Sequence, residues 1–270
     1  MNLGLKTISK SFYFQFLPAQ ILGVITIGCL VAGKISPLYL IGTAVMWVLC
    51  CGLGIAVGYH RVFSHRTHTL PKWKENLILF FAVFAGQGAS IFWVALHRGY
   101  HHPHTDQQQD LHSPVVYGRW HAFIGWYLKI TETSNPVNIK YAVDLLRKDN
   151  HVWFHKNYFK ILWGVPAVIA LFDWQLSLTA FALVTMIGTI QDNLVNVYGH
   201  VPSFISYRNF ETRDASQNNL FLGYAAWGQG WHNNHHWAPQ SYDFGKGVSG
   251  RWWEWDPCNI FKLFLGPTNS

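Results

Sequence analysis

The chain has 270 residues, of which 50% are hydrophobic and only 12% are charged. Soluble globular chains usually carry about 25% charged residues, so this chain is either unusually buried or embedded in a membrane. The formal net charge of +7 suits nucleic acid or an anionic membrane, and the placement of the charges favours the membrane with no nucleic-acid partner. The four cysteines form no C-x-x-C pair, so neither a disulfide framework nor a zinc ribbon is indicated.

Long apolar segments occur in two pairs along the chain. A membrane-spanning helix needs about 20 mostly apolar residues. Four segments approach or exceed this length, with a short turn inside each pair: 14–33, 37–60, 159–172 and 176–200. The pattern predicts an all-α integral membrane protein with four transmembrane helices in two helical hairpins. We expect a single domain over residues 1–270, with a cytoplasmic helical cap formed by residues 61–158 and 201–270.

The fifth apolar run, residues 75–96, is long enough to span a membrane. A span there would put the histidines at 60–65 and those at 97–102 on opposite sides. Gly86 and Gly88 also interrupt the run. We therefore expect two short helices in the interface rather than a span.

Lysine and arginine are distributed unevenly between the predicted loops. Lys34 lies in the first hairpin turn, the second turn has neither residue type, and nearly all the others follow the second and fourth spans. The positive-inside rule then places both termini and the cap in the cytoplasm. We expect a multi-pass protein of a bacterial inner membrane, with its histidine clusters on the cytoplasmic side.

Eight histidines form three local clusters. These are His60 and His65; His97, His101 and His102; and His232, His235 and His236. Helix positions four apart share a face, whereas neighbours diverge by about 100°. Each adjacent pair can therefore direct its two imidazoles at different centres. Eight ligands exceed what one ion takes, so the pattern indicates two metal ions.

A ninth histidine, His200, lies four residues after Asn196 at the cytoplasmic end of the last predicted span. Both side chains therefore share a helix face. His200 alone would be read as an interfacial histidine, and with the other clusters it becomes a candidate ligand. Imidazole suits zinc, copper, iron and nickel, and no glutamate is followed by a histidine three residues later. A zinc-dependent membrane hydrolase therefore stays open at this point.

Six motifs occur in the order found in the membrane fatty-acid desaturases. They are GYHRVFSHRTH (58–68), GQGASIFWVALHRGYHHPHTD (86–106), DLHSP (110–114), LVNVYGH (194–200), GWHNNHH (230–236) and RWWEWDP (251–257). Over residues 52–262 the chain resembles the delta-9 group of that family, which includes stearoyl-CoA desaturase and bacterial acyl-lipid desaturases.

The resemblance implies an oxygen-dependent oxidoreductase with a non-haem di-iron centre. The nine histidines would ligate two iron ions, and Asn196 would hold a water near one of them. Two hydrogens would leave neighbouring methylenes of a saturated acyl chain, giving a cis double bond, with dioxygen as co-substrate. Gln87 and Trp93 would line the bend of the acyl tunnel. A separate ferredoxin or small haem protein would deliver the electrons.

Three features depart from the family pattern. The box HRGYHH is one residue longer than the commoner HRxHH. Gln229 replaces a carboxylate that the family commonly carries beside the third box. Gly88, Ala95 and Leu96 stand where animal acyl-CoA enzymes have polar or charged residues. We therefore expect an acyl chain carried on a lipid or on a differently bound thioester, and the sequence leaves the carrier open.

The remaining histidines that we considered receive a structural interpretation: His68, His104, His112, His121, His151 and His155. Among these, His104 and His112 are candidates for supporting the ligands through hydrogen bonds. The nearest rival function is a hydroxylase on the same di-iron scaffold. A non-catalytic metal-binding or transport protein is a further alternative, but among ionisable residues of the spans only Asp192 stands out.

Overall fold

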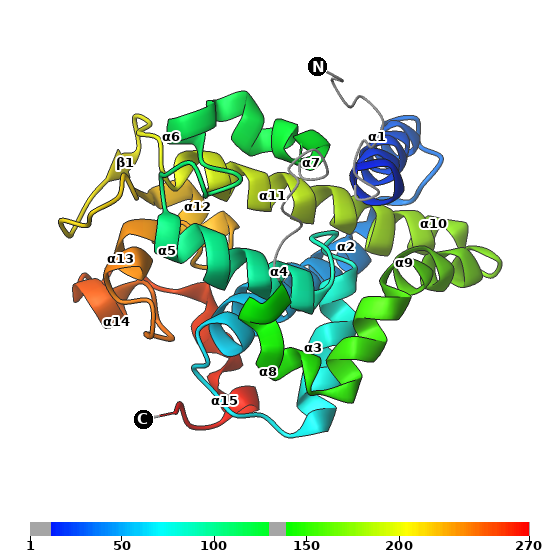
Figure 1. The fold of residues 1–270 in the computed structure, drawn as a ribbon. Coiled ribbons are helices and arrows are strands. Elements are labelled where there is room, and N and C mark those ends of the chain that lie inside the picture. Colours follow the sequence, from blue (N-terminus) through cyan, green and yellow to red (C-terminus); the bar gives the residue numbers. More distant parts are fainter. Residues whose placement is uncertain (1–11, 130–138, 270) are drawn as a thin grey trace, which may run out of the picture.

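The structure is a computed structural model that describes residues 12–129 and 139–269. Helices make up nearly all of its regular structure (Figure 1). One small antiparallel sheet pairs β1 (Ser206–Tyr207) with β2 (Asn218–Asn219). The predicted all-α architecture is therefore confirmed in its main feature.

Three helical segments of the described chain are long and apolar enough to cross a membrane. The first, Phe12–Val31, joins η1 (Phe12–Phe16) to α1 (Leu17–Val31). The second, Pro37–Ser64, joins η2 (Pro37–Tyr39), α2 (Leu40–Trp47) and η3 (Val48–Ser64). The third, Trp174–Tyr198, joins α10 (Trp174–Ser177), η7 (Leu178–Leu183) and α11 (Val184–Tyr198). These three segments cover the predicted span 37–60 completely and the predicted spans 14–33 and 176–200 except for their last two residues, and they fit a membrane-embedded protein.

The fourth predicted span, 159–172, falls mostly in α9 (Asp149–Ala170). This helix begins well before the predicted span and carries polar residues such as Lys156 and Lys160 in its first half. With 22 residues it is long enough, but it is not among the helices that are also apolar enough to cross a membrane. A fourth span therefore stays a prediction.

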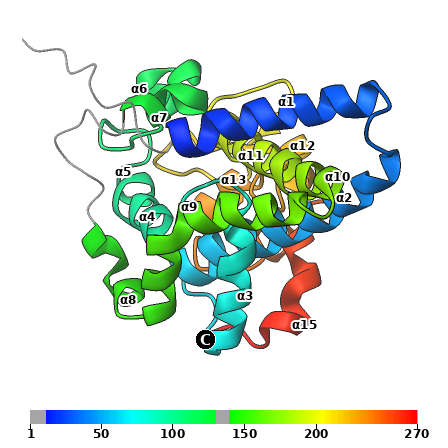
Figure 2. The same cartoon turned by 90° about the vertical axis from the view of Figure 1, so that its right-hand side faces the viewer.

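The long helices do not pack as two separate hairpins. The segment η7–α11 lies between α1 and α2 and contacts both, and α9 packs against α10 and α3 (Figures 1 and 2). Close approach depends on small residues, because a Cβ atom on Gly23 would lie 2.4 Å from the sulfur of Met186. The central helix α11 thus reaches the cap with neighbours on both sides.

The apolar run 75–96 forms two short helices, as predicted. They are α3 (Lys72–Val83) and α4 (Ser90–Leu96). Between them Gly86 and Gly88 adopt positive φ angles of 70° and 86°, a conformation that glycine takes without steric cost. The break turns the chain so that α4 leads directly into the second histidine box.

The cap consists of short helices that follow the long ones in sequence. They are η4 (His97–His101), α5 (His102–His104), α6 (Pro114–Tyr117), η5 (His121–Gly125), α7 (Trp126–Lys129), η6 (Ile139–Ala142), α8 (Val143–Leu146), α12 (Leu220–Ala225), α13 (His232–Trp237), α14 (Lys246–Ser249), η8 (Pro257–Phe261) and α15 (Lys262–Leu265). The C-terminal segment returns to the second long helix, where the backbone N–H of Asn269 donates to the carbonyl of Thr67 at 2.8 Å.

Candidate metal centre

All nine candidate histidines come together in the structure, in two clusters. Within each cluster one nitrogen of every ring lies within 4.8 Å of the others. The five-histidine cluster contains His60, His65, His97, His102 and His235. The four-histidine cluster contains His101, His200, His232 and His236. The predicted division of each adjacent pair between two centres is what the structure shows for His101 and His102 and for His235 and His236.

The five-histidine cluster depends on wide helical turns. Residues five apart diverge by about 140° on an α-helix, yet His60 and His65 belong to one cluster, as do His97 and His102. Both pairs lie at π-type turns, where the backbone N–H of His65 donates to the carbonyl of His60 at 3.1 Å and that of His102 to the carbonyl of His97. A π-turn stacks residues five apart on one face. The π-turn accommodates the extra residue of HRGYHH, because it keeps His97 and His102 on one face.

The third box is a single short helix, α13, held by its asparagines. His232 and His236 lie four apart and face the four-histidine cluster, while His235 faces the other. Asn233 accepts hydrogen bonds from the backbone N–H groups of Asn209 and Phe210 at 2.8 and 2.9 Å. Asn233 thus fixes the position of α13, the helix that directs three imidazoles toward the two clusters.

Buried Asn234 and Glu254 connect α13 to the C-terminal segment. The Asn234 amide donates to Glu254 at 2.7 Å and to the carbonyl of Phe244 at 2.9 Å. Glu254 also accepts from Tyr207 and Asn209. The motif RWWEWDP therefore has a structural role that the sequence did not reveal.

In both clusters the Nε2 atoms that face the cluster centre, here called the inner nitrogens, have the spacing of ligands that bind one cation. The Nε2 atoms of His60 and His235 lie 2.9 Å apart, and those of His200 and His232 also lie 2.9 Å apart. Two nitrogens bound to one ion at about 2.1 Å and at about 90° lie about 3.0 Å apart. Buried His236 Nε2 has no hydrogen-bond partner among the described residues. The residues therefore fit a metal ion in each cluster.

Burial favours the neutral form, which is the form that binds metal, in the five imidazoles named next, whereas Asp110 and its neighbours raise the pKa of His101 despite its burial. It lowers the pKa of His65 to about 3 and the pKa of His236 to about 4. Burial also places the pKa of His97, His102 and His235 well below the ordinary histidine value. At neutral pH the lone pairs are available.

Three aspartates that sequence reasoning missed hold the outer nitrogens of the four-histidine cluster. The Nδ1–H groups of His101, His200 and His236 are donated to Asp110, Asp106 and Asp214 at 3.2, 3.2 and 2.9 Å. Burial would raise the pKa of each carboxyl group, yet the facing histidines hold it below its ordinary value. All three are therefore anionic at neutral pH. Such partners fix the tautomer and raise the basicity of a ligand.

Asp106 is itself held in place by the cap, so that its carboxylate faces His200. Its backbone has a positive φ of 60°, which is uncommon for a residue other than glycine. Its carboxylate accepts from Ala215 N at 2.7 Å and from His200. The motifs HTD (104–106) and DLH (110–112) contained the signal, because both place a carboxylate close in sequence to a histidine box.

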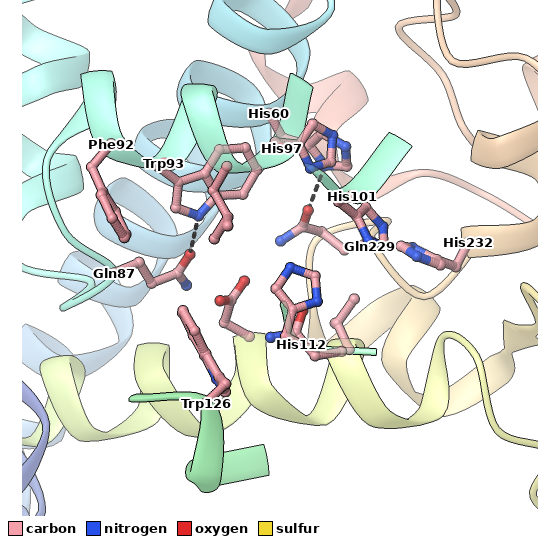
Figure 3. A pocket seen from close by; sticks show the side chains of 14 residues that line it. His60, Gln87, Phe92, Trp93, His97, His101, His112, Trp126, Gln229 and His232 are labelled. Carbon is pink, nitrogen blue, oxygen red and sulfur yellow. Dashed lines mark hydrogen bonds between the residues drawn. The ribbon is translucent and has the colours of Figure 1, made fainter. Parts of the chain in front are cut away.

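Gln229 takes the corresponding position at the five-histidine cluster. Its Oε1 atom lies 2.6 Å from Nδ1 of His60 (Figure 3). Gln229 is 3% exposed, and its Nε2 has no hydrogen-bond partner among the described residues. The departure from the family pattern therefore concerns a group in direct contact with a candidate ligand.

A cavity opens beside both clusters. It is lined by four candidate ligands, by apolar side chains and by a few polar groups: His60, Gln87, Phe92, Trp93, Leu96, His97, His101, His112, Trp126, Asp192, Val195, Asn196, Gln229 and His232. Gln87 and Trp93 lie together there, with Trp93 Nε1 donating to Gln87 Oε1 at 3.2 Å (Figure 3). The Trp93 ring also stacks on His97 at a centroid distance of 4.9 Å. Asn196 lines the cavity near His232.

Two of the remaining histidines are more deeply placed than their polar surroundings in sequence suggest. His112 lines the cavity and lies 3.4 Å from Asp110, the carboxylate that also holds His101. His151 is fully buried and its Nδ1 lies 2.9 Å from the hydroxyl of Ser90. The expected supporting role thus fits His112 by position. Within residues 12–129 and 139–269, the His104 side chain forms no hydrogen bond or ion pair that would give it the same role.

The comparisons with known proteins agree with this site. The family model for "Fatty acid desaturase" matches residues 36–247. A probable chloroplastic lipid desaturase of Arabidopsis thaliana, ADS3.2, is 30% identical over 90% of this chain and 66% of its own length. An sn-2 palmitoyl-lipid 9-desaturase of Nostoc sp. (strain 36) is 33% identical over 76% of this chain and 70% of its own length.

A third relative, an acyl-CoA 5-desaturase of Anemone leveillei, is 30% identical over 82% of this chain and 68% of its own length. The chain thus spans about two thirds of the length of these relatives. The family match covers most of the chain and includes all three histidine boxes. The chain belongs to the delta-9 type of the fatty acid desaturase family, and it is accordingly an oxidoreductase.

Proposed function

We propose that this chain is an oxygen-dependent desaturase that introduces a cis double bond at the ninth carbon of a saturated acyl chain carried on a lipid. The observation that carries the proposal is the convergence of nine histidines, in clusters of five and four, beside a cavity with an apolar wall of Phe92, Trp93, Leu96, Trp126 and Val195. The name of the Nostoc relative supports the ninth position, and the names of the Arabidopsis and Nostoc relatives support a lipid carrier.

The residues at positions 88, 95 and 96 favour a lipid over coenzyme A as the acyl carrier. Ala95 is fully buried and Leu96 lines the cavity with an apolar side chain. Gly88 uses its N–H to donate to the hydroxyl of Tyr158 at 3.0 Å. These three positions therefore offer no charged group to a coenzyme A head group.

In this proposal the five and four histidines hold two non-haem iron ions, and Asn196 holds a water beside the four-histidine cluster. When bound, the irons would supply the activation of dioxygen. The overall reaction would take one hydrogen from each of two neighbouring methylenes, consume dioxygen, two electrons from the separate donor and two protons, and release two water molecules. Neutral imidazole donors and the lack of a glutamate–histidine pair suit this centre.

The protein's own residues position the chain and exclude water. Gln87 is fixed by two hydrogen bonds, one received from Trp93 and one donated to the carbonyl of Gly188 at 3.2 Å. The stacked Trp93 and His97 rings connect this wall to the five-histidine cluster. An acyl chain held against the Gln87–Trp93 pair would present a fixed pair of carbons to the centre.

We also infer the membrane arrangement from charge and apolar surface. Leu171 and Phe172, at the end of α9, are 81% and 87% exposed, as expected for side chains that face lipid. With α9 as a fourth span, both termini and the candidate centre lie on the cytoplasmic side of a bacterial inner membrane. A separate ferredoxin or small haem protein would dock on the basic cytoplasmic face.

Expression in cells that make only saturated lipids tests the proposed function. Lipid analysis by mass spectrometry should show monounsaturated acyl chains with the double bond at the ninth carbon. Hydroxylated chains in their place would identify a hydroxylase. Unchanged lipids, together with two zinc ions in protein purified without metal exchange, would support a zinc hydrolase and contradict the proposal.

A further inference from the structure

The two histidine clusters differ in the charge of the groups that hold their outer nitrogens. In the four-histidine cluster three of the four rings donate Nδ1–H to an aspartate. These carboxylates are themselves fixed. Asp214 accepts from Thr212 Oγ1 at 2.8 Å and from Ser216 N at 3.0 Å, and Asp110 is 1% exposed. The cluster therefore carries a preorganised negative shell.

The five-histidine cluster has no such shell. The only acceptor recorded for its outer nitrogens in residues 12–129 and 139–269 is the neutral amide of Gln229, at 2.6 Å from His60. The two arginines whose charges act on this cluster are Arg61, which is paired with Asp256, and Arg98, which shares Asp144 with Arg66. Neither arginine supplies a negative group to the outer nitrogens.

We propose that the two clusters bind their metal ions with unequal affinity, and that Gln229 makes the five-histidine cluster the weaker site. This inference rests on the proposed di-iron function. A carboxylate that accepts the outer N–H of a ligating histidine strengthens the ligand, and removing such a partner typically costs 10- to 100-fold in metal affinity. The four-histidine cluster has three such partners and the five-histidine cluster has none.

One effect opposes this order. The five-histidine cluster offers one more imidazole, whereas a water must complete the other site. A neutral fifth ligand adds one bond, but three anionic partners act on three bonds and also offset the charge of the ion. We therefore expect the four-histidine cluster to fill first.

Residue 229 allows a conservative test. Glutamate has the shape of glutamine, and the Nε2 of Gln229 is a buried donor without a partner in the described chain. Gln229→Glu would keep the oxygen that faces His60, remove the unpaired donor and add one negative charge. Asp214→Asn makes the opposite change beside His236. Gln240→Glu adds the same charge at an exposed position three residues after α13 and serves as the control.

The experiment is an anaerobic titration of metal-free, detergent-solubilised full-length protein with iron(II), followed by calorimetry, and with cobalt(II), followed by visible absorption. The wild-type chain should bind two ions in two resolved steps. Gln229→Glu should tighten the weaker step by roughly 10- to 100-fold, Asp214→Asn should weaken the tighter step by a similar factor, and Gln240→Glu should change neither.

Two ions bound with one common affinity by the wild-type chain would overturn the inference, even if a variant failed to fold. The same holds if Gln229→Glu altered only the tighter step or behaved like Gln240→Glu. In these cases a chain that still binds two irons and forms double bonds keeps its proposed function. Binding of fewer than two ions would instead contradict the di-iron function, and the inference with it.

Discussion

The guanidinium of Arg61 and the carboxylate of Asp256 form an ion pair of 2.7 Å between two side chains with no solvent exposure. The pair joins the helix that carries His60 to the C-terminal segment. Phe244 lies between them and the site, because its N–H donates to Asp256 at 2.8 Å, its ring lies 3.8 Å from the Arg61 guanidinium, and it contacts His235 at a centroid distance of 4.2 Å. The pair therefore supports both the fold and the position of His235.

Asp256→Asn should destabilise the protein strongly. Removing one partner of a buried ion pair leaves the other charge uncompensated, at a cost of about 3–5 kcal/mol. The unfolding temperature of the detergent-solubilised variant should fall by many degrees and its metal content should drop. Arg66→Gln is the matched control, because Arg66 is 66% exposed in its pair with Asp144 and such pairs contribute about 0–1 kcal/mol. Equal unfolding temperatures for the two variants would contradict the assigned role.

Acid should weaken the contact between α3 and the start of α9. Burial would raise the pKa of Glu75, but the neighbouring His151, at 3.8 Å, and hydrogen bonds from Lys148 and Asn150 lower it to about 2. The unfolded value is about 4.3, so the folded state favours the carboxylate. Its contribution is present above about pH 4.3 and is lost as the pH falls toward 2.

Glu75→Gln should therefore lower the unfolding temperature at pH 6 and lower it much less at pH 3. Circular dichroism in detergent over this pH range measures both values. Equal losses at the two pH values would show that the ionisation of Glu75 contributes nothing. Asp149→Asn, which replaces another acidic residue at the start of α9, controls for the overall change in charge.

Trp93→Ala should change where the acyl chain is held. The variant loses the ring that stacks on His97 and the hydrogen bond to Gln87, so the chain gains freedom at the wall nearest the centre. We expect about tenfold less product and double bonds at more than one carbon, because small misplacements of the reacting atoms are costly. Mass spectrometry of derivatised lipids locates the bonds. Trp153→Ala, at a 55% exposed position on α9, should keep a single product, and a single product from both variants would remove Trp93 from the tunnel wall.

Local spacing explains which parts of the site could be predicted. The separation of four between His232 and His236 fixes a shared face on any α-helix, so their cluster followed from the sequence. The pairs His60–His65 and His97–His102 did not, because they depend on π-turns that have no sequence signal of this kind. These four histidines were candidate ligands only because they belong to histidine-box motifs.

Tertiary structure decided the remaining features. Asp214 lies far from the first two boxes in sequence and reaches His236 only through the loop after β1. The glycine break at 86–88 was readable, since positive φ angles favour glycine. The fourth span was not settled by composition, because α9 mixes lysines with an apolar second half. Long-range partners and lipid exposure are properties of the folded chain.

Loss of one central histidine tests the di-iron desaturase most directly. His235 contacts both His60 and His102 through Nε2 at 2.9 Å, whereas His155 is exposed on α9. Both alanine variants should be expressed beside the wild type in cells with only saturated lipids, and double bonds and bound iron should be measured per chain. The account predicts two irons and cis-monounsaturated lipids for the wild type and His155→Ala, and neither full iron loading nor product for His235→Ala. A fully active His235→Ala variant would contradict the account.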